Sequence, residues 1–423
     1  DASGPNSLDN ILVAGQFNFA AGTLHVTDSD GFTIGASGRI ASEIGGSAAR
    51  LGPGQNLVID SLLTIPAGTS LTLESGVGSA DLTIVSSGAS VTNASGSSLI
   101  AGPVVALAGS RIRVDSGILS IGDASAVDGF GSAGQMHIGS NSVVLLDAND
   151  AVFDSLASIS LGDASNPGEL DAAGGLTLDF GANIAGFGMV DTPNNPATPV
   201  INNGHITGNS LAEPVTLTGY VKGVGTCDNC NITGTDAPGF STAAVNRGSV
   251  SYNGTLEIEL GGTTPGRGYD QLKHILGAGV ANLGGTLEVQ LIDSFVPSAG
   301  DKFDIIHAAS ILGQFDTVSS PELPGDLLWF LNYTPTTVEL VSTFGADFDE
   351  DGDVDQNDLV NWESGFGSTT AVHMTGDANI DSTADGFDFL VWQRQFRSGG
   401  QLAVAATVAP ETSSVTLTML GAV

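Results

Sequence analysis

The chain has 423 residues and a formal net charge of −35 at pH 7, from 46 acidic and only 11 basic residues. This balance excludes nucleic acid and anionic membrane surfaces as partners, because phosphate binding needs clustered lysine and arginine. A hydrophobic fraction of 41% excludes wholesale disorder, and the 59 glycines with 6% aromatic residues indicate a folded, all-β protein of many short strands.

The N-terminus gives an expectation about location. The chain begins at Asp1 without the basic and apolar segments of an export signal, so we expect such a signal to have been removed. No run approaches the roughly 20 apolar residues that a membrane-spanning helix needs. We therefore expect a secreted or cell-surface (extracellular) protein with no membrane span.

Residues 1–240 consist of short segments in which apolar and polar residues alternate between Gly, Ser, Asn and Asp. Related sequences recur at steps of about twenty residues or of two such steps, a spacing typical of repeat proteins. They are Gly68-Thr-Ser-Leu71, Gly88-Ala-Ser-Val91 and Gly109-Ser-Arg-Ile112, and Ser120–Ser125 with Ser160–Ser165. This pattern predicts a right-handed β-solenoid (β-helix), whose coils stack their inward apolar residues. A set of ordinary sandwiches is the alternative.

Cys227 and Cys230 form a C-x-x-C segment within loop and strand sequence. A zinc site would need two further ligands, and no second C-x-x-C or histidine pair lies nearby. We expect a disulfide, as in extracellular proteins, with two free thiols as the alternative.

Residues 241–343 contain longer alternating segments with fewer glycines, including Gly254–Leu260 and Gly285–Leu291. They predict an antiparallel β-sandwich that caps the solenoid and covers its edge. Four segments also carry a resemblance: Ala237-Pro-Gly-Phe-Ser241, Leu256–Gly262, Thr264–Asp270 and Gly284–Val289. Through them the region resembles the segment that follows β-helical repeats in surface proteins of planctomycete-type and autotransporter-type bacteria. The resemblance implies no catalytic residue.

Two segments further on carry oxygen-bearing side chains at positions 1, 3, 5, 9 and 12 of a twelve-residue loop, the spacing that surrounds Ca²⁺ with oxygen ligands. The first loop has Asp347, Asp349, Asp351, Asp355 and Asp358, with Asp353 at position 7, and the second has Asp377, Asn379, Asp381, Asp385 and Asp388, with Thr383 at position 7. Carboxylates crowded in this way repel one another unless a cation lies between them. The alternative is a solvated acidic linker, against which the regular spacing argues.

Apolar residues at helical spacing follow each loop: Leu359, Trp362 and Phe366 after the first, and Phe389, Leu390, Trp392 and Phe396 after the second. This repeated loop–helix unit, a double F-hand over residues 344–400, resembles a type I dockerin module. The resemblance implies that the ten side chains at positions 1, 3, 5, 9 and 12 bind Ca²⁺, and that Asp353 and Thr383 bind it through their carbonyl groups.

The chain departs from the dockerin pattern in two ways. Ser382 stands where the first loop has Gly352, and a residue other than glycine in a left-handed turn costs about 1 kcal/mol, so we expect the second site to be weaker. Gln356-Asn357 and Gly386-Phe387 replace the small hydroxyl residues with which dockerins meet a cohesin, which argues against a cohesin partner.

Residues 401–423 are predicted to form a linker and a terminal segment. Ala409–Ser414, followed by the apolar Val415–Val423, resembles the start of a PEP-CTERM sorting tail. That resemblance implies export and attachment to, or release from, an envelope or exopolysaccharide. A frayed terminus is the alternative.

The sequence contains no G-x-S-x-G, H-E-x-x-H or Walker motif. We expect no catalytic residue and no cofactor other than Ca²⁺. The favoured function is a structural or adhesive protein of an extracellular matrix, filament or surface layer, with a matrix protein, an exopolysaccharide or further copies of itself as partner. The alternative is a β-helix that binds or cleaves a polysaccharide.

Overall fold

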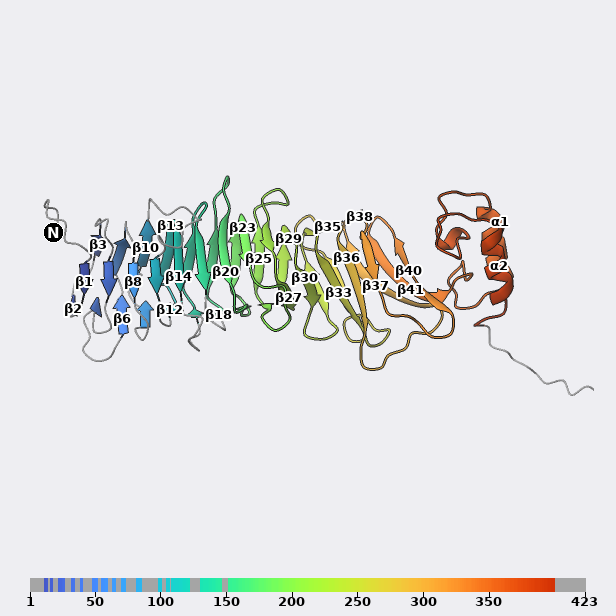
Figure 1. Cartoon of the computed structure of the whole chain (residues 1–423), viewed down its shortest axis with the longest axis horizontal. Helices are drawn as coiled ribbons and strands as arrows, with labels where there is room; N and C mark the ends of the chain where they lie inside the picture. The colour runs from blue at the N-terminus through green and yellow to red at the C-terminus, as the bar shows by residue number, and fades with distance from the viewer. Residues whose placement is uncertain are drawn as a thin grey trace, which may run out of the picture. The chain divides into compact units, whose positions relative to one another are not determined.

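Strands dominate the structure, a computed structural model that describes residues 108–121, 130–146 and 151–399, together with the strands between residues 11 and 106. Short alternating segments and glycine-rich corners favour this all-β architecture, as predicted. Three long sheets contain most of the strands and are visible as successive arrows in Figure 1.

Sheets 1, 2 and 3 have 13, 9 and 12 strands within the described chain. Sheet 1 contains β1 (Ile11–Val13), β4 (Phe32–Ile34), β8 (Leu63–Ile65), β11 (Ser98–Ile100), β14 (Ile118–Ile121), β17 (Val143–Leu146), β20 (Gly168–Ala172), β23 (Gly188–Asp191), β26 (Val215–Leu217), β29 (Cys230–Ile232), β32 (Val250–Tyr252), β35 (Val280–Leu283) and β38 (Ser310–Gly313). Sheet 2 contains β3 (Gly22–Val26), β7 (Gln55–Ile59), β10 (Asp81–Val85), β13 (Arg111–Ser116), β16 (Gln135–Ile138), β19 (Ser158–Leu161), β22 (Asn183–Gly186), β25 (His205–Gly208) and β28 (Thr226–Asp228). Sheet 3 contains β6 (Ala48–Leu51), β9 (Ser70–Leu73), β12 (Val104–Ala106), β15 (Phe130–Ser132), β18 (Ala151–Phe153), β21 (Leu176–Leu178), β24 (Val200–Asn202), β27 (Tyr220–Gly223), β30 (Thr235–Pro238), β33 (Thr255–Leu260), β36 (Thr286–Leu291) and β39 (Thr317–Ser319).

The remaining described strands form two smaller sheets. One pairs β2 (Gln16–Phe17) with β5 (Arg39–Ile40), and the other, sheet 4, contains β31 (Ala244–Arg247), β34 (Gln271–His274), β37 (Asp301–Ala308), β41 (Thr337–Phe344) and β40 (Leu327–Tyr333) in that order.

From β9 to β30, consecutive strands enter the three long sheets in turn, so each sheet gains every third strand; from β31 to β39, sheet 4 takes the place of sheet 2 in this rotation. The strands of these sheets pair in parallel and in register, which places side chains of one kind directly above one another. The inward-facing ladder of sheet 1 shows this, since each of its members is at most 1% exposed: Leu119, Val144, Leu170, Val190, Leu217 and Ile232. Burial of these ladders forms one continuous hydrophobic core, an arrangement compatible with a β-solenoid.

The antiparallel sandwich predicted for residues 241–343 is wrong for most of its strands. β32, β33, β35 and β36 extend sheets 1 and 3 in parallel, and β31 and β34 also pair in parallel. Antiparallel pairing between whole strands begins where β41 joins β37: Gly300 N donates to Ser342 O at 2.8 Å and Ala308 N to Thr336 O at 2.9 Å, so the two segments run in opposite directions. Alternation in sequence marks a strand with one buried face, but not the direction of its neighbour.

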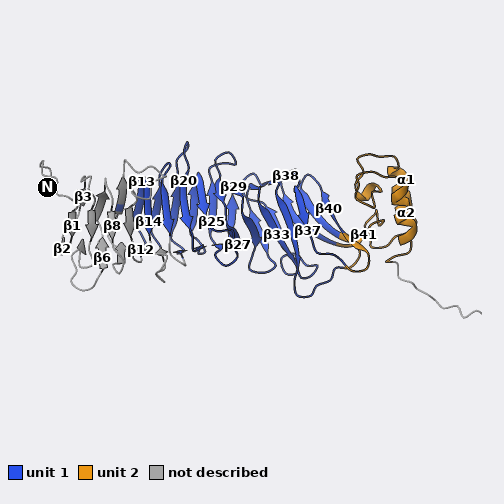
Figure 2. Ribbon diagram, in the orientation of Figure 1, with its two compact units in different colours: residues 1–297, 302–323, 329–341 blue, residues 298–301, 324–328, 342–423 orange. Residues whose placement is uncertain are grey.

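The described chain divides into two compact units, coloured in Figure 2. Unit 1 comprises residues 1–297, 302–323 and 329–341, and unit 2 comprises residues 298–301, 324–328 and 342–423. The linker and sorting tail predicted for residues 401–423 lie outside the described residues.

Unit 2 contains both α-helices of the described chain, α1 (Gln356–Gly365) and α2 (Gly386–Gln395), and a short 3₁₀-helix, η2 (His373–Thr375). Its small core contains the buried Ala346, Phe348, Val354, Ala378 and Trp392. This core is separate from that of unit 1, so it must be stabilised locally.

Candidate metal centre

The two predicted loops have the same local structure in unit 2, each ending in the first turn of a helix. Asp355 is the N-cap of α1 and accepts a hydrogen bond from Asn357 N at 2.6 Å. Asp385 is the N-cap of α2 and accepts one from Phe387 N at 2.7 Å. N-cap side chains satisfy backbone N–H groups that the helix itself leaves unpaired, which explains why the helices begin here.

The aspartates at position 12 close each loop. Asp358 accepts hydrogen bonds from Phe348 N at 2.6 Å and from Asp355 N at 2.8 Å. Asp388 accepts the corresponding bonds from Ala378 N at 2.9 Å and Asp385 N at 2.7 Å. Both carboxylates are fully buried, so each loop is built around its last acidic residue.

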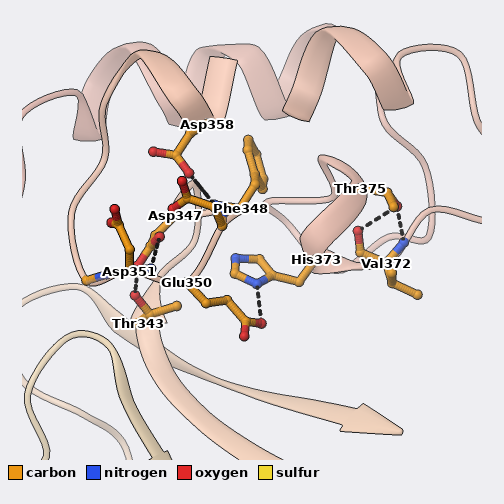
Figure 3. Close-up of polar contacts among 11 residues, drawn as sticks. Thr343, Asp347, Phe348, Glu350, Asp351, Asp358, Val372, His373 and Thr375 are labelled. Carbon is orange, nitrogen blue, oxygen red and sulfur yellow. Dashed lines mark hydrogen bonds and ion pairs between the residues drawn. The ribbon is translucent and has the colours of Figure 1, made fainter. Parts of the chain in front are cut away.

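The aspartates at position 1 hold the middle of each loop. Asp347 accepts from Asp351 N at 3.2 Å and Gly352 N at 2.9 Å, and the hydroxyl of Thr343 also donates to it (Figure 3). In the second loop, Asp377 accepts from Asp381 N at 3.1 Å and Ser382 N at 2.8 Å.

Each loop contains two residues with left-handed backbone conformations. In the first loop these are Glu350 at φ 56° and Gly352 at φ 97°. In the second loop they are Ile380 at φ 61° and Ser382 at φ 66°. The left-handed turn expected at Ser382 is present. The β-branched Ile380 adds a strained position that sequence reasoning missed, since no glycine marks it.

The carboxylates of the first loop converge. Asp347, Asp349 and Asp351 each offer an oxygen atom within 4.8 Å of the others. The Oδ1 atom of Asp349 is buried and has no hydrogen-bond partner in the part of the chain that the structure describes. A buried carboxylate oxygen without a donor is costly, and a bound cation would remove that cost.

Electrostatics point in the same direction. Burial is the largest cause that raises the pKa of Asp347 to about 7 and that of Asp358 to about 6. Burial also raises the pKa of Asp349, and repulsion from Asp351 adds to it. These shifts report carboxylates that lack a counter-charge in the protein. An all-oxygen donor set of this kind fits a hard divalent cation such as Ca²⁺.

The second loop holds less charge, because Asn379 and Thr383 replace two of the aspartates of the first. The Asp381 carboxylate accepts from Thr383 N at 2.9 Å and from Asn379 Nδ2 at 3.1 Å. The Thr383 hydroxyl also donates to Asp381. This bond is the largest cause that lowers the pKa of Asp381, and the bonds from Thr383 N and Asn379 Nδ2 add to it. The loop is therefore held together partly by its own hydrogen bonds.

Two residues outside the predicted ligand set form a buried pair at the first loop: Glu350, which belongs to the loop, and His373 on η2. His373, on η2, places Nδ1 at 3.4 Å from Glu350 Oε1, and its ring centroid lies 5.7 Å from that of Phe348 (Figure 3). Both side chains of the His373–Glu350 pair are buried, at 4% and 1% exposure. This pair was not predicted from the sequence, because its members lie 23 residues apart and neither occupies a predicted ligand position.

Within unit 2, indole groups connect the two loop–helix repeats. Trp362 Nε1 donates to Asp385 O at 2.9 Å, and Trp392 Nε1 donates to Asp355 O at 2.9 Å. Phe389 lies between the indoles, with ring centroids 4.9 Å from Trp362 and 5.6 Å from Trp392. Of the predicted apolar helix faces, Phe366, Leu390 and Phe396 are instead exposed, at 59%, 55% and 38%.

The two cysteines lie in unit 1 and are joined as a disulfide, with Cα atoms 6.0 Å apart. Cys227 is in β28 and Cys230 in β29, so the bond crosses from sheet 2 to sheet 1 within one turn of the chain. Both are buried, at 2% and 0% exposure.

Comparison with known proteins adds no name to this site. No protein-family model matches the chain, and no curated protein matches its sequence. Neither α-helix that the structure describes has the length and apolar character needed to cross a membrane.

Proposed function

We propose that this chain is a secreted or cell-surface structural protein, in which a right-handed β-solenoid displays a calcium-stabilised, dockerin-like docking module. The observation that carries the proposal is the convergence of Asp347, Asp349 and Asp351, one of them with a buried oxygen that has no hydrogen-bond partner in the described chain. When bound, Ca²⁺ would supply the counter-charge that the loop lacks.

The residues proposed to hold the first ion are the side chains of Asp347, Asp349, Asp351, Asp355 and Asp358, with the carbonyl group of Asp353. Those proposed for the second are the side chains of Asp377, Asn379, Asp381, Asp385 and Asp388, with the carbonyl group of Thr383. The same hydrogen bonds occur at positions 1, 9 and 12 of both loops, which supports assigning equivalent ligand positions to the two loops.

The solenoid part of the proposal rests on the parallel three-sheet arrangement and the stacked apolar ladders of unit 1. A chain of this kind adds length by adding turns, which suits a rod or spacer in a matrix, filament or surface layer. The Cys227–Cys230 disulfide supports the proposed location, because disulfides persist in oxidising environments outside the cytosol.

The proposed partner is a matrix protein, an exopolysaccharide or further copies of the chain. Exposed apolar side chains in unit 2, such as Phe387 at 68% and Val360 at 56% exposure, give the docking module a surface to offer. Phe387 lies at a position where dockerins contact a cohesin, but it differs from the small hydroxyl residues of that pattern, so the proposal does not include a cohesin.

The experiment that tests the docking proposal compares the full chain with and without Ca²⁺, by hydrogen exchange and by electron microscopy. Chelation is expected to remove protection from amides in residues 342–399 while those of residues 151–297 stay protected. Filaments or lattices that form only with Ca²⁺ would identify copies of the chain as partner. Equal protection of unit 2 in both conditions would contradict the proposal.

A further inference from the structure

A trough lies on the outer face of sheet 3, in unit 1, with a volume of about 120 Å³. Its lining includes Tyr220 and Lys222 on β27, Ala237 on β30, Glu257 and Glu259 on β33, and Phe240 and Asp270 in neighbouring loops. It is distinct from the acidic loops of unit 2 in both residues and chemistry.

The register of the sheet explains why the trough exists. Lys222 on β27 pairs with Ala237 on β30, and Thr235 pairs with Thr255, which places Glu257 on the other side of Ala237. Long side chains therefore flank a short one in the same row. Since neighbouring strands lie about 4.8 Å apart, the small alanine leaves a gap between the two walls.

The walls are fixed by specific contacts. The Tyr220 hydroxyl donates to Glu257 Oε1 at 2.9 Å, across the intervening strand β30. Asp270 is 1% exposed and accepts from Ala243 N at 2.6 Å and Glu259 N at 2.8 Å, so it anchors the two chain segments that border the trough. A trough fixed in this way needs little rearrangement to receive a ligand.

One aromatic ring at the rim is open to solvent. Phe240 is 61% exposed, and the Lys222 ammonium lies 5.7 Å from its ring centroid. The apolar face of this ring is therefore available for contact with a ligand.

The charges of the trough select the ligand class. Glu257 pairs with Glu288 across β33 and β36, and Glu259 follows two residues later on the same face. Burial is the main cause that raises the pKa of Glu257 and of Glu259, with repulsion between carboxylates adding to it. The carboxylates of Glu257 and Glu259 outnumber the one ammonium group of the lining, that of Lys222, so the trough disfavours an anion and suits a ligand rich in hydroxyl donors.

We propose that this trough binds one neutral sugar ring of a polysaccharide, with hydroxyl groups donating to Glu257 and Glu259 and an apolar ring face against Phe240. The small volume of about 120 Å³ limits the contact to a single ring, since pockets for drug-sized ligands enclose roughly 300–1,000 Å³. The rest of the glycan would continue along the surface of unit 1. This proposal does not depend on calcium binding by unit 2.

The test titrates the full chain calorimetrically with neutral hexasaccharides of glucose, mannose, galactose and xylose, and with a hexasaccharide of galacturonic acid. At least one neutral hexasaccharide is expected to bind, the uronic acid is expected to bind more weakly, and a chelator is expected to leave the affinity unchanged. The proposal would be overturned if none of the neutral probes bound at millimolar concentration, or if the uronic acid bound more tightly than they did. Tighter binding of a lysine hexapeptide would also overturn it, and would indicate a cationic protein partner.

Variants locate the binding. Phe240→Ala and Glu257→Gln should each weaken it at least about tenfold, because each removes a contact of the ring or a charged acceptor. Glu257→Gln retains the acceptor that Tyr220 needs, so the fold is preserved. Phe180→Ala is the matched control, since Phe180 is 82% exposed and does not line the trough. Equal affinity in Phe240→Ala and in the control would place the glycan elsewhere.

Discussion

Trp392 on α2 donates its indole N–H to the backbone carbonyl group of Asp355, the N-cap of α1, at 2.9 Å. Trp362 on α1 makes the same bond to Asp385, the N-cap of α2. Each helix therefore holds the end of the other helix's loop. The two acidic loops are coupled through these bonds, and a change in one should be felt by the other.

This coupling can be tested at one indole. Trp392→Phe keeps most of the ring contacts and removes the donor, so we expect unit 2 to lose about 1 kcal/mol of stability. Urea unfolding followed by the far-ultraviolet helical signal measures this loss. Phe366→Leu, at a side chain that is 59% exposed, should change stability by less than about 0.5 kcal/mol. If both variants unfold at the same urea concentration as the wild type, the indole bond is not structural.

Ser382→Gly should stabilise the second loop by about 1 kcal/mol, because Ser382 has φ 66° and glycine adopts this conformation without a steric cost. The reciprocal change, Gly352→Ser, should cost more than that, since a Cβ atom there would lie 2.9 Å from Ala299 O. Thermal unfolding in the presence of Ca²⁺ compares the two variants. Equal effects of opposite sign would show that only the backbone conformation matters, and a loss of stability in Ser382→Gly would contradict the interpretation.

A buried histidine in unit 1 gives a dependence on pH. His274 Nδ1 is 2.7 Å from Gly248 O and Nε2 is 3.2 Å from the Tyr252 hydroxyl, and burial lowers the pKa of His274 to about 4. The unfolded chain binds this proton near its ordinary pKa of 6.5, whereas the folded protein does not. His274 therefore contributes stability that is fully present above pH 6.5 and falls as the pH drops toward 4, by about 3 kcal/mol in total. Buried carboxyl groups with raised pKa values, such as Asp270, contribute a slope of the opposite sign.

Urea unfolding of the full chain between pH 4 and pH 7 measures this slope. His274→Gln should lower stability at neutral pH and remove the His274 contribution from the slope, so the difference between the variant and the wild type isolates this group. His205→Gln, at an exposed position, should leave the slope as in the wild type. A wild-type slope that persists in His274→Gln would show that other groups control the pH dependence.

The strands and the buried ladders could be predicted, because alternation of apolar and polar residues reports which face of a strand is buried. The register could not. Ser120 lies on β14 in sheet 1 and Ser160 on β19 in sheet 2, so the similar segments that contain them are not equivalent positions in successive turns. The number of residues between paired strands also varies. Val190 pairs with Leu217, 27 residues later, whereas Leu217 pairs with Ile232, only 15 residues later. Gly88–Val91, part of the predicted repeat, lies outside the described residues.

The acidic loops could be predicted from spacing alone, because their geometry is local and each ligand position follows from its number in the loop. The His373–Glu350 pair and the two indole bonds could not, since they join segments distant in sequence. The trough on sheet 3 was also missed, because it depends on Ala237 lying between Lys222 and Glu257 in the register of three strands.

Calorimetric titration of the full chain with Ca²⁺ tests the central claim most directly. We predict uptake at two sites, with the first loop the stronger; Asp351→Ala should remove the tighter event, and Asp381→Ala, at the equivalent position, only the weaker one. Absence of heat from Ca²⁺ binding in the wild type, or titrations that the two substitutions leave unchanged, would contradict the account of the acidic loops as metal centres.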